Sequence, residues 1–322
     1  MNRGTPRVAI MADETGWHTL HLQAALRLRG ASGRCVDLAH CCIDTTHACH
    51  GLVIPGFGRE LPDAVLVRGI AGGSFEQVTR RLGVLHAMRE LGVPVYNDAR
   101  AIERSVDKSM TSLLLHAAGV PTPPTWALES SAQAQRIVMR QSAAGHALVL
   151  KPLFGSQGKG LQLIGHLGGK HHALPELDGP YGKVAYLQRF IVPTQAPGFD
   201  WRVLVVAGRA ITAMRRVSMH WVHNVALGAS CEPAAMTPEL ARLAQDAAHT
   251  LGLDYAGVDI MPGSAESGQA SPALQVIEVN GVAAWQGLQR VTPFNIAQAL
   301  VDDLLTRRLA AAGSALAAPR RA

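Results

Sequence analysis

The chain has 322 residues, of which 48% are apolar and only 17% are charged. This composition excludes an intrinsically disordered chain, because disorder requires low hydrophobicity together with high charge. The length predicts about two domains, and a net charge of +6 suits an anionic ligand such as a nucleotide. Nucleic acid is not an expected partner, because the chain contains no extended basic run.

The sequence also predicts a compartment. No run of about 18 apolar residues occurs, so no membrane span is expected. The first apolar run is short and stops at Asp13 and Glu14, which argues against a signal peptide. Five cysteines, an odd number, fit free thiols better than a disulfide framework. A cytoplasmic protein is therefore expected.

The first hundred residues alternate short apolar strands with helical segments. Strands are expected at 7–11, 64–68 and 94–97, and helices at 19–29 and 75–91. Strand, helix and strand with short connections predict a parallel sheet with right-handed crossovers. The turn after the first strand lacks G-x-G-x-x-G, so a dinucleotide-dependent dehydrogenase is not expected.

The pattern of predicted elements changes after about residue 104. The expected elements are, in chain order, a helix over 107–118, strands over 147–152 and 185–191, a hairpin of 201–206 with 210–216, a helix over 238–251, strands over 258–261 and 274–280, and a helix over 296–309. Short strands in hairpins, followed by helices, are typical of an α+β arrangement.

Three oxygen-bearing side chains lie on the last two expected strands. Glu278 and Asn280 share one face of their strand because they are two residues apart. If the two strands pair as a hairpin, Asp259 lies across from them. Two carboxylates and an amide oxygen form a donor set that suits Mg²⁺. The alternative is that all three are solvated residues at strand ends.

A glycine-rich loop follows the strand that ends in Lys151. Three glycines in the six residues 155–160 allow backbone N–H groups to close around phosphate oxygens, and lysines complement the charge. The loop is not a Walker loop. The alternative for this loop alone is an ordinary hairpin turn, and the alternative for Lys108, just inside a helix, is a solvated side chain.

Seven motifs in one order resemble the ATP-grasp superfamily, and specifically its RimK-like α-L-glutamate ligase branch. They are Lys108 in SVDKSM, Lys151 in VLKPLFGSQGKG, LQRFI at 187–191, Asp200 and Arg202 in DWRVLVV, Asn224 in HNVALGA, Asp259 in GVDI, and Glu278 with Asn280 in IEVN. The resemblance implies an α/β and α+β protein with the ATP-grasp fold. It implies an N-terminal parallel-sheet domain over 1–103, a central lid subdomain over 104–192, a C-terminal subdomain over 193–311 and a frayed tail over 312–322.

The resemblance also implies roles for these residues. ATP would lie between the two subdomains and contact Lys108, Lys151 and Asp200. The lid loop would cover the phosphates with Gly155, Ser156, Gln157, Gly158, Lys159 and Gly160, and the hinge residues Gln188, Arg189, Phe190 and Ile191 would bind the adenine. Asp259, Glu278 and Asn280 would hold two Mg²⁺ ions, which Mn²⁺ could replace.

The implied reaction is ATP-dependent amide formation through an acyl-phosphate. The residues expected to act on the substrate are Arg202, Asn224 and one of the neighbours Arg215 and Arg216. The arginines are candidates because guanidinium groups match carboxylate and phosphate oxygens. Only one of these two neighbours can point inward on a strand, and Arg215 is the one favoured here.

The chain departs from the family where the acceptor should bind. Arg189 replaces the usual hinge glutamate, and the proline that usually follows the last motif is missing. Trp221 and Trp285 flank the expected metal site, so a flat, pterin-like acceptor could stack on them, as in the tetrahydromethanopterin-type glutamate ligases that this branch resembles. The alternative is that both tryptophans belong to the core.

The leading prediction is an ATP-dependent carboxylate–amine ligase that adds glutamate to an amine or to a small molecule that bears a γ-carboxylate. The protein is expected to form a homo-oligomer. Two alternatives stay open: glutamylation of a protein terminus, and a nucleotide-binding regulatory module without catalysis. A Cys/His-rich segment at 40–50 could in principle bind Zn²⁺, but it lacks paired C-x₂-C motifs. Free thiols in a connection are expected there.

Overall fold

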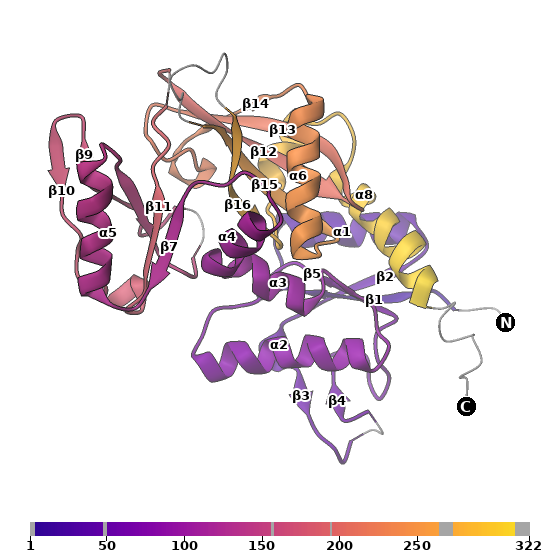
Figure 1. The fold of residues 1–322 in the computed structure, drawn as a ribbon. Helices are drawn as coiled ribbons and strands as arrows, with labels where there is room; N and C mark the ends of the chain where they lie inside the picture. The colour runs from indigo at the N-terminus through magenta and orange to yellow at the C-terminus, as the bar shows by residue number, and fades with distance from the viewer. Residues whose placement is uncertain (1–3, 48–49, 156–157, 194, 264–272, 313–322) are drawn as a thin grey trace.

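The computed structural model describes residues 4–47, 50–155, 158–193, 195–263 and 273–312. Three main sheets follow one another along the chain, and helices cover them (Figure 1). The predicted α/β and α+β fold class is confirmed. In the described part, no helix is long and apolar enough to cross a membrane.

The N-terminal sheet is parallel, as expected. Its strands are β1 (Arg7–Met11), β2 (Ser32–Val36), β5 (Ala64–Val67) and β6 (Val95–Tyr96), in the order β2-β1-β5-β6. Alternate residues of β1 face opposite sides, so Val8 and Ile10 pack with helix α1 (Trp17–Leu28), whereas Ala9 and Met11 pack with helix α2 (Phe75–Glu90). The sheet is therefore buried on both faces, as parallel sheets are.

The Cys/His-rich segment lies outside this sheet. It forms a 3₁₀ turn (Leu38–His40) and a small hairpin of β3 (Cys42–Ile43) with β4 (Leu52–Val53) at the bottom of Figure 1. Among the described residues, no three His, Cys, Asp or Glu side chains lie together as a metal site would require. Cys49 lies outside the described residues.

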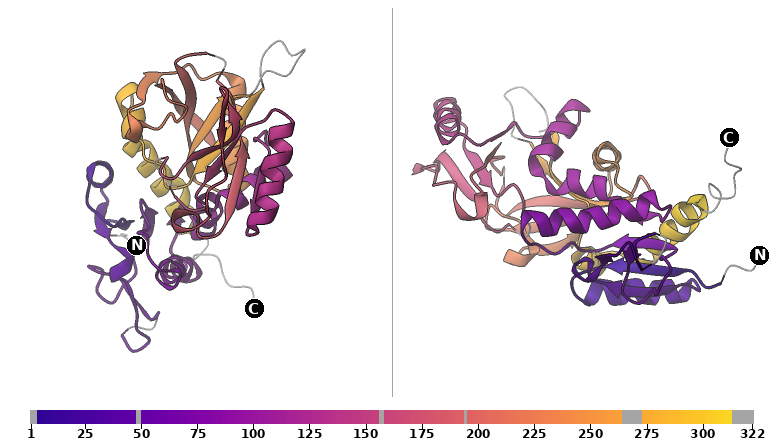
Figure 2. Two further views of the ribbon diagram at one scale, coloured as in Figure 1. Left: turned by 90° about the vertical axis from the view of Figure 1, so that its left-hand side faces the viewer. Right: turned by 90° about the horizontal axis from the view of Figure 1, so that it is seen from below.

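The central sheet is antiparallel and stands to one side of the other two (Figure 2). Its strands are β7 (Thr125–Leu128), β8 (Leu148–Lys151), β9 (Gln162–Leu167), β10 (Lys170–His172) and β11 (Ala185–Arg189), and helix α5 (Ser131–Ala143) covers it. The sequence analysis predicted β8 and β11 but did not predict β7, β9, β10 or α5.

The third sheet carries most of the candidate site. Its strands are β12 (Gly198–Val206), β13 (Arg209–Ser218), β14 (Ser230–Pro233), β15 (Tyr255–Pro262) and β16 (Leu274–Asn280), all antiparallel. Helix α6 (Pro238–Leu251), which the sequence predicted with the same bounds, buries Leu240, Leu243 and Leu251 against one face. The opposite face carries the charged residues described below.

Short helices join the three sheets. They are α3 (Ala99–Val106), α4 (Lys108–Ala117), α7 (Gln286–Val291) and α8 (Ile296–Asp303), which continues as a π-helix over Leu304–Leu309. Helix α8 packs on α1, so the end of the chain contributes to the core of the N-terminal domain (Figure 1). The division at residues 103 and 192 stays a proposal, and residues 313–322 of the expected tail lie outside the described residues.

Candidate active site

Strand register brings the charged residues together on one face of the third sheet. Residues directly opposite each other in an antiparallel pair point to the same side. Arg202 on β12 lies opposite Asp259 on β15, and Asp259 lies opposite Glu278 on β16. On the other side of β12, Asp200 lies opposite Arg216 on β13. The predicted pairing of Asp259 with Glu278 is therefore confirmed.

These side chains make an oxygen-donor set that fits a divalent cation. Glu278 and Asn280 share a face, and the Asn280 amide nitrogen donates to the Gly257 carbonyl at 3.3 Å. This hydrogen bond uses the nitrogen and leaves the amide oxygen as a ligand. Two carboxylates and one amide oxygen suit Mg²⁺, which takes few protein ligands and completes its shell with water and phosphate.

Two lysines reach the same place from different elements. Helix α4 begins at Lys108 because Asp107 caps it, accepting hydrogen bonds from the Ser109 and Met110 N–H groups. Lys108 Nζ donates to the Gly155 carbonyl of the lid loop at 2.8 Å. Lys151, at the end of β8, donates to Gln188 Oε1 at 2.7 Å. Both lysines line the same cavity as Gly155 and Gly158 of the glycine-rich loop, and Lys108 contacts that loop directly.

Burial makes Lys151 unusually easy to deprotonate. It lowers the pKa of Lys151 to about 8, and the attraction of Glu278 opposes this only in part. Nucleotide affinity without metal should therefore fall as pH rises through about 8, by up to about tenfold per pH unit, because the ammonium charge is lost. Lys151→Arg keeps its charge at every pH, so its affinity should stay flat. Calorimetric titration with ADP between pH 7 and 9.5 tests this, and equal slopes for the two proteins would contradict it.

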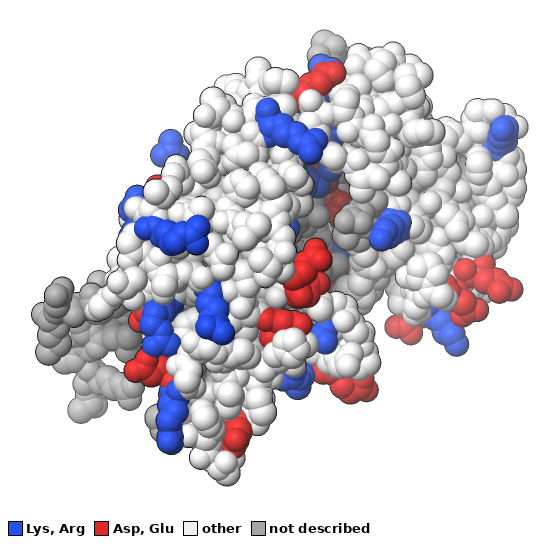
Figure 3. All heavy atoms as spheres, turned by 180° about the vertical axis from the view of Figure 1, so that it is seen from behind, with Lys and Arg blue, Asp and Glu red and all other residues white. Residues whose placement is uncertain are grey.

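The site is a cavity with about 840 Å³ of empty space, including the part open to solvent. A hollow with acidic and basic side chains at its edge lies near the middle of the face shown in Figure 3. Thirteen of the predicted site residues line the cavity: Lys108, Lys151, Gly155, Gly158, Lys159, Gln188, Arg189, Phe190, Ile191, Asp200, Asn224, Asp259 and Glu278.

The other predicted residues lie elsewhere. Asn280 is next to the cavity wall on β16, Arg202 is bound to Asp259, and Gly160 packs near Pro152 at the end of the lid loop. Ser156 and Gln157 lie outside the described residues. Arg189 lines the cavity, but its Nη2 donates to Gln141 of α5 at 3.0 Å. Part of its guanidinium is therefore bound to α5.

The inward-facing arginine is Arg216, so the prediction of Arg215 was wrong. Arg216 is 4% exposed and lines the cavity, where it donates two hydrogen bonds to Asp200, at 2.7 and 2.6 Å. Arg215 instead pairs with Glu232 at 3.2 Å on the partly exposed face and lies over the Phe199 ring.

A β-bulge explains this difference. Near the turn, Val206 pairs with Arg209, a register that would place Arg215 opposite Asp200. One extra residue in β13, at the shift between Leu204 and Val205, moves every later pair by one position. A shift of one residue exchanges the two faces of a strand, and Arg216 therefore faces Asp200.

One ionisable residue of the cavity wall, His223, was not predicted from the sequence. His223 is 3% exposed, its Nδ1 lies 3.9 Å from Asp200 Oδ2, and its Nε2 has no hydrogen-bond partner among the described residues. Burial, with the adjacent Arg216 charge, lowers the pKa of His223 to about 4, so the ring is neutral at pH 7. No spacing or motif in the sequence distinguishes this histidine from the other thirteen.

The two tryptophans proposed for acceptor stacking have different positions. Trp221 lines the cavity and packs edge-on against Phe190, with ring centroids 5.8 Å apart. Trp285 is 0% exposed and packs against His18 and Trp17 of α1. The stacking hypothesis is therefore wrong for Trp285, which is a core residue joining the third sheet to the N-terminal domain.

The fold and the site define an ATP-grasp ligase architecture, and comparison with known proteins agrees. The RimK pre-ATP-grasp domain model matches residues 7–102, and the RimK-like ATP-grasp domain model matches residues 105–304. The chain belongs to the RimK-like ATP-grasp family, whose members use ATP with Mg²⁺.

Among curated proteins, the chain is similar to tetrahydromethanopterin:α-L-glutamate ligases. It is 35% identical to that of Methanococcus maripaludis over 66% of this chain and 70% of the relative, and 32% identical to that of Methanosarcina acetivorans over 75% and 79%. Among solved structures, the ATP-grasp ligase PsnB in complex with a minimal precursor superposes with a TM-score of 0.66 at 21% identity, over 94% of this chain and 99% of PsnB. This last likeness concerns the fold.

Proposed function

We propose that this protein is an ADP-forming ligase that joins glutamate to a pterin-like small molecule by an amide bond. The observation that carries the proposal is the convergence of Lys108, Lys151, Asp259 and Glu278 on one cavity that also contains Arg216. The substrate class follows from the curated relatives, which are named for glutamate and tetrahydromethanopterin.

The charged residues of the cavity have different roles in the proposed reaction. ATP brings a polyanion, and Lys108 and Lys151 offset the repulsion that a substrate carboxylate meets when it attacks the γ-phosphate. Two magnesium ions, or Mn²⁺ in their place, would be held by Asp259, Glu278 and Asn280 and would neutralise the phosphates during transfer. Arg216 provides a planar cation for the oxygens of the acyl-phosphate.

The second half of the reaction needs an amine near the activated carbonyl. The amine attacks the carbonyl carbon, the C–N bond forms, and the bond to the phosphate oxygen breaks. Asn224 lies at the cavity wall beside the lid loop, where a Cβ on Gly158 would approach its Nδ2 to 2.8 Å. This proximity to the glycine-rich loop supports our proposal that Asn224 orients the substrates.

Trp221 is the residue that we propose for acceptor recognition. A flat heteroaromatic ring stacked on an indole gains about 1 kcal/mol or more beyond surface burial, so Trp221→Ala should weaken acceptor binding by about tenfold. KM for a tetrahydropterin substrate at saturating ATP is the measurement. Trp126→Ala is the matched control, because Trp126 lies on β7 outside the cavity. Equal effects of the two substitutions would exclude stacking.

A coupled assay for ADP tests the proposed function. We expect ADP release that requires glutamate and a tetrahydropterin together, and that stops when either is omitted. Release that depends on a protein terminus instead of the tetrahydropterin would contradict the small-molecule substrate. The expected homo-oligomer also stays a proposal, for which sedimentation velocity is the test.

A further inference from the structure

Three buried side chains that line the cavity, Asp200, Arg216 and Asp259, form a closed network with the partly buried Arg202, here called the Asp259 network. Arg202 donates to both carboxylate oxygens of Asp259, with Nη2 2.7 Å from Oδ2. Arg216 Nη2 lies 2.9 Å from the same Oδ2, and its other hydrogen bonds go to Asp200. Two acids face two bases, so the network is formally neutral.

This arrangement conflicts with metal binding by Asp259. Asp259 is 1% exposed, and both of its oxygens already accept hydrogen bonds from guanidinium groups. A cation bound directly to this carboxylate would lie about 2 Å from one of these oxygens, close to two fixed positive charges. Because the site is buried, water screens this repulsion poorly. Asp259 therefore has two competing sets of partners.

The two arginines would lose different hydrogen bonds if Asp259 changed partner. Arg216 keeps Asp200 as a bidentate partner whatever Asp259 does. Among the described residues, the Arg202 guanidinium donates hydrogen bonds to Asp259 alone, and Arg202 does not line the cavity. Its aliphatic stem packs over Gly257, where a Cβ would approach Arg202 Cδ to 3.1 Å. Arg202 is thus the group set free when Asp259 changes partner.

We propose that Asp259 exchanges Arg202 for the metal when the metal–nucleotide complex binds, and that the released Arg202 guanidinium then binds the substrate carboxylate. This proposal rests on the proposed function. It predicts an order, in which the metal–nucleotide complex binds first and the carboxylate substrate second. Release of Arg202 supports this order, because its guanidinium becomes available to a carboxylate only after Asp259 has taken the metal in its place.

Direct measurement of metal binding tests the exchange without turnover. Free Mn²⁺ is counted by electron paramagnetic resonance during titration of the protein in the presence of ADP. If Arg202 competes for Asp259, Arg202→Gln should bind Mn²⁺ about tenfold more tightly than the wild type, a typical size for such coupling. If Arg202 only supports Asp259, the variant should bind Mn²⁺ equally or more weakly, and that result would overturn the proposal.

Two control variants separate this outcome from failure of the proposed site. Arg215→Gln, on the same sheet but paired with Glu232, should leave Mn²⁺ affinity unchanged. Glu278→Gln should weaken it. Mn²⁺ binding that ignores Glu278→Gln would show that the metal site itself is misplaced, whatever Arg202 does.

A second experiment uses only the wild-type protein, in case Arg202→Gln does not fold. With ¹⁵N-labelled arginine, buried guanidinium N–H groups bound to carboxylates give signals protected from solvent exchange. Addition of Mg²⁺ and ADP should remove the protection of one such signal while the Arg216 signal stays protected. A spectrum that keeps every protected signal would overturn the proposal.

Discussion

Glu278→Gln is expected to lower kcat/KM by on the order of 10²–10³-fold while leaving the fold intact. The substitution keeps the shape of the side chain but removes a negative charge that lies directly opposite Asp259 in the strand register. A neutral amide binds Mg²⁺ more weakly than a carboxylate does. The loss should therefore fall on phosphoryl transfer. It is measured as ADP release and checked against an unchanged circular dichroism melt.

A matched control is available on β14, the opposite edge strand of the same sheet. Glu232 is a partly exposed glutamate that pairs with Arg215 outside the cavity, so Glu232→Gln should change activity by less than about twofold. If Glu278→Gln retained nearly wild-type turnover, Glu278 would not be a metal ligand. The assignment of the face formed by β12, β15 and β16 would then be wrong.

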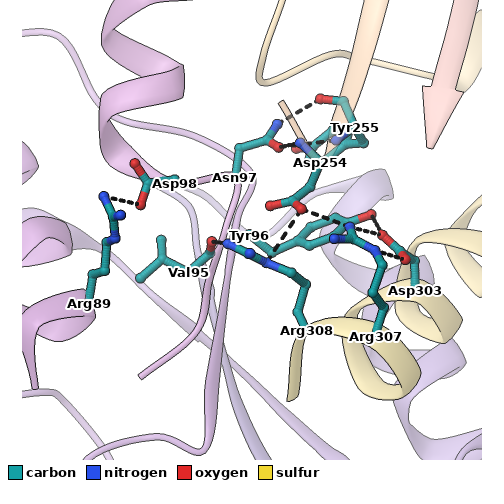
Figure 4. Close-up of polar contacts among 10 residues, drawn as sticks. All are labelled: Arg89, Val95, Tyr96, Asn97, Asp98, Asp254, Tyr255, Asp303, Arg307 and Arg308. Atoms are coloured by element: carbon teal, nitrogen blue, oxygen red, sulfur yellow. Dashed lines mark hydrogen bonds and ion pairs between the residues drawn. The ribbon is translucent and has the colours of Figure 1, made fainter. Parts of the chain in front are cut away.

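Asn97→Ala is expected to cost about 3–4 kcal/mol of the free energy of unfolding. Asn97 is 0% exposed, and Figure 4 shows its side chain bound to the backbone of Asp254 and Tyr255 at the start of β15. It also binds the backbone of Gly281, just after β16. Its Nδ2 donates to the Tyr255 and Gly281 carbonyls at 2.7 and 2.6 Å, and its Oδ1 accepts from the Asp254 and Tyr255 N–H groups. Alanine would leave these buried backbone groups without their partners.

The effect of Asn97→Ala should also reach the site. Gly281 directly follows Asn280, so loss of the Asn97 hydrogen bonds should loosen the end of the strand that carries the proposed metal ligands Glu278 and Asn280. Urea unfolding is the measurement, with Gln133→Ala on the exposed surface of α5 as the control, for which a change below about 0.5 kcal/mol is expected. Equal midpoints for the two variants would show that the Asn97 hydrogen bonds do not hold the domains together.

Local patterns predicted the elements that build the site. Strand 7–11, helix 238–251 and strand 274–280 have the same bounds in the structure as in the prediction. The sequence signals of these elements are strong because each is local. The strand 7–11 is an apolar run, the helix 238–251 begins with a proline and is followed by a glycine, and the strand 274–280 alternates polar residues. The facing of Asp259 and Glu278 was predicted only on the condition that the two strands pair as a hairpin, and in the structure it also depends on a register shift between Asp259 and Ile260.

Long-range effects explain what the sequence could not show. The bulge in β13 is one unpaired residue with no strong sequence signature, yet it decides whether Arg215 or Arg216 faces the cavity. Trp285 follows β16 along the chain. It is buried against α1, which lies more than 260 residues earlier in the sequence, and His18 of α1 accepts a hydrogen bond from its backbone N–H. Such contacts depend on tertiary packing, which overrides local pattern.

Intact-mass spectrometry of the products can show whether the protein uses ATP to attach glutamate to a small molecule. The protein is incubated with ATP, Mg²⁺ and isotope-labelled glutamate, with a small-molecule extract in one reaction and ribosomal proteins in another. We predict a small molecule that gains a labelled glutamyl unit, in step with ADP formation, in the wild type and not in Glu278→Gln. Label on a protein terminus, or no label in either reaction while ATP is bound, would contradict the account.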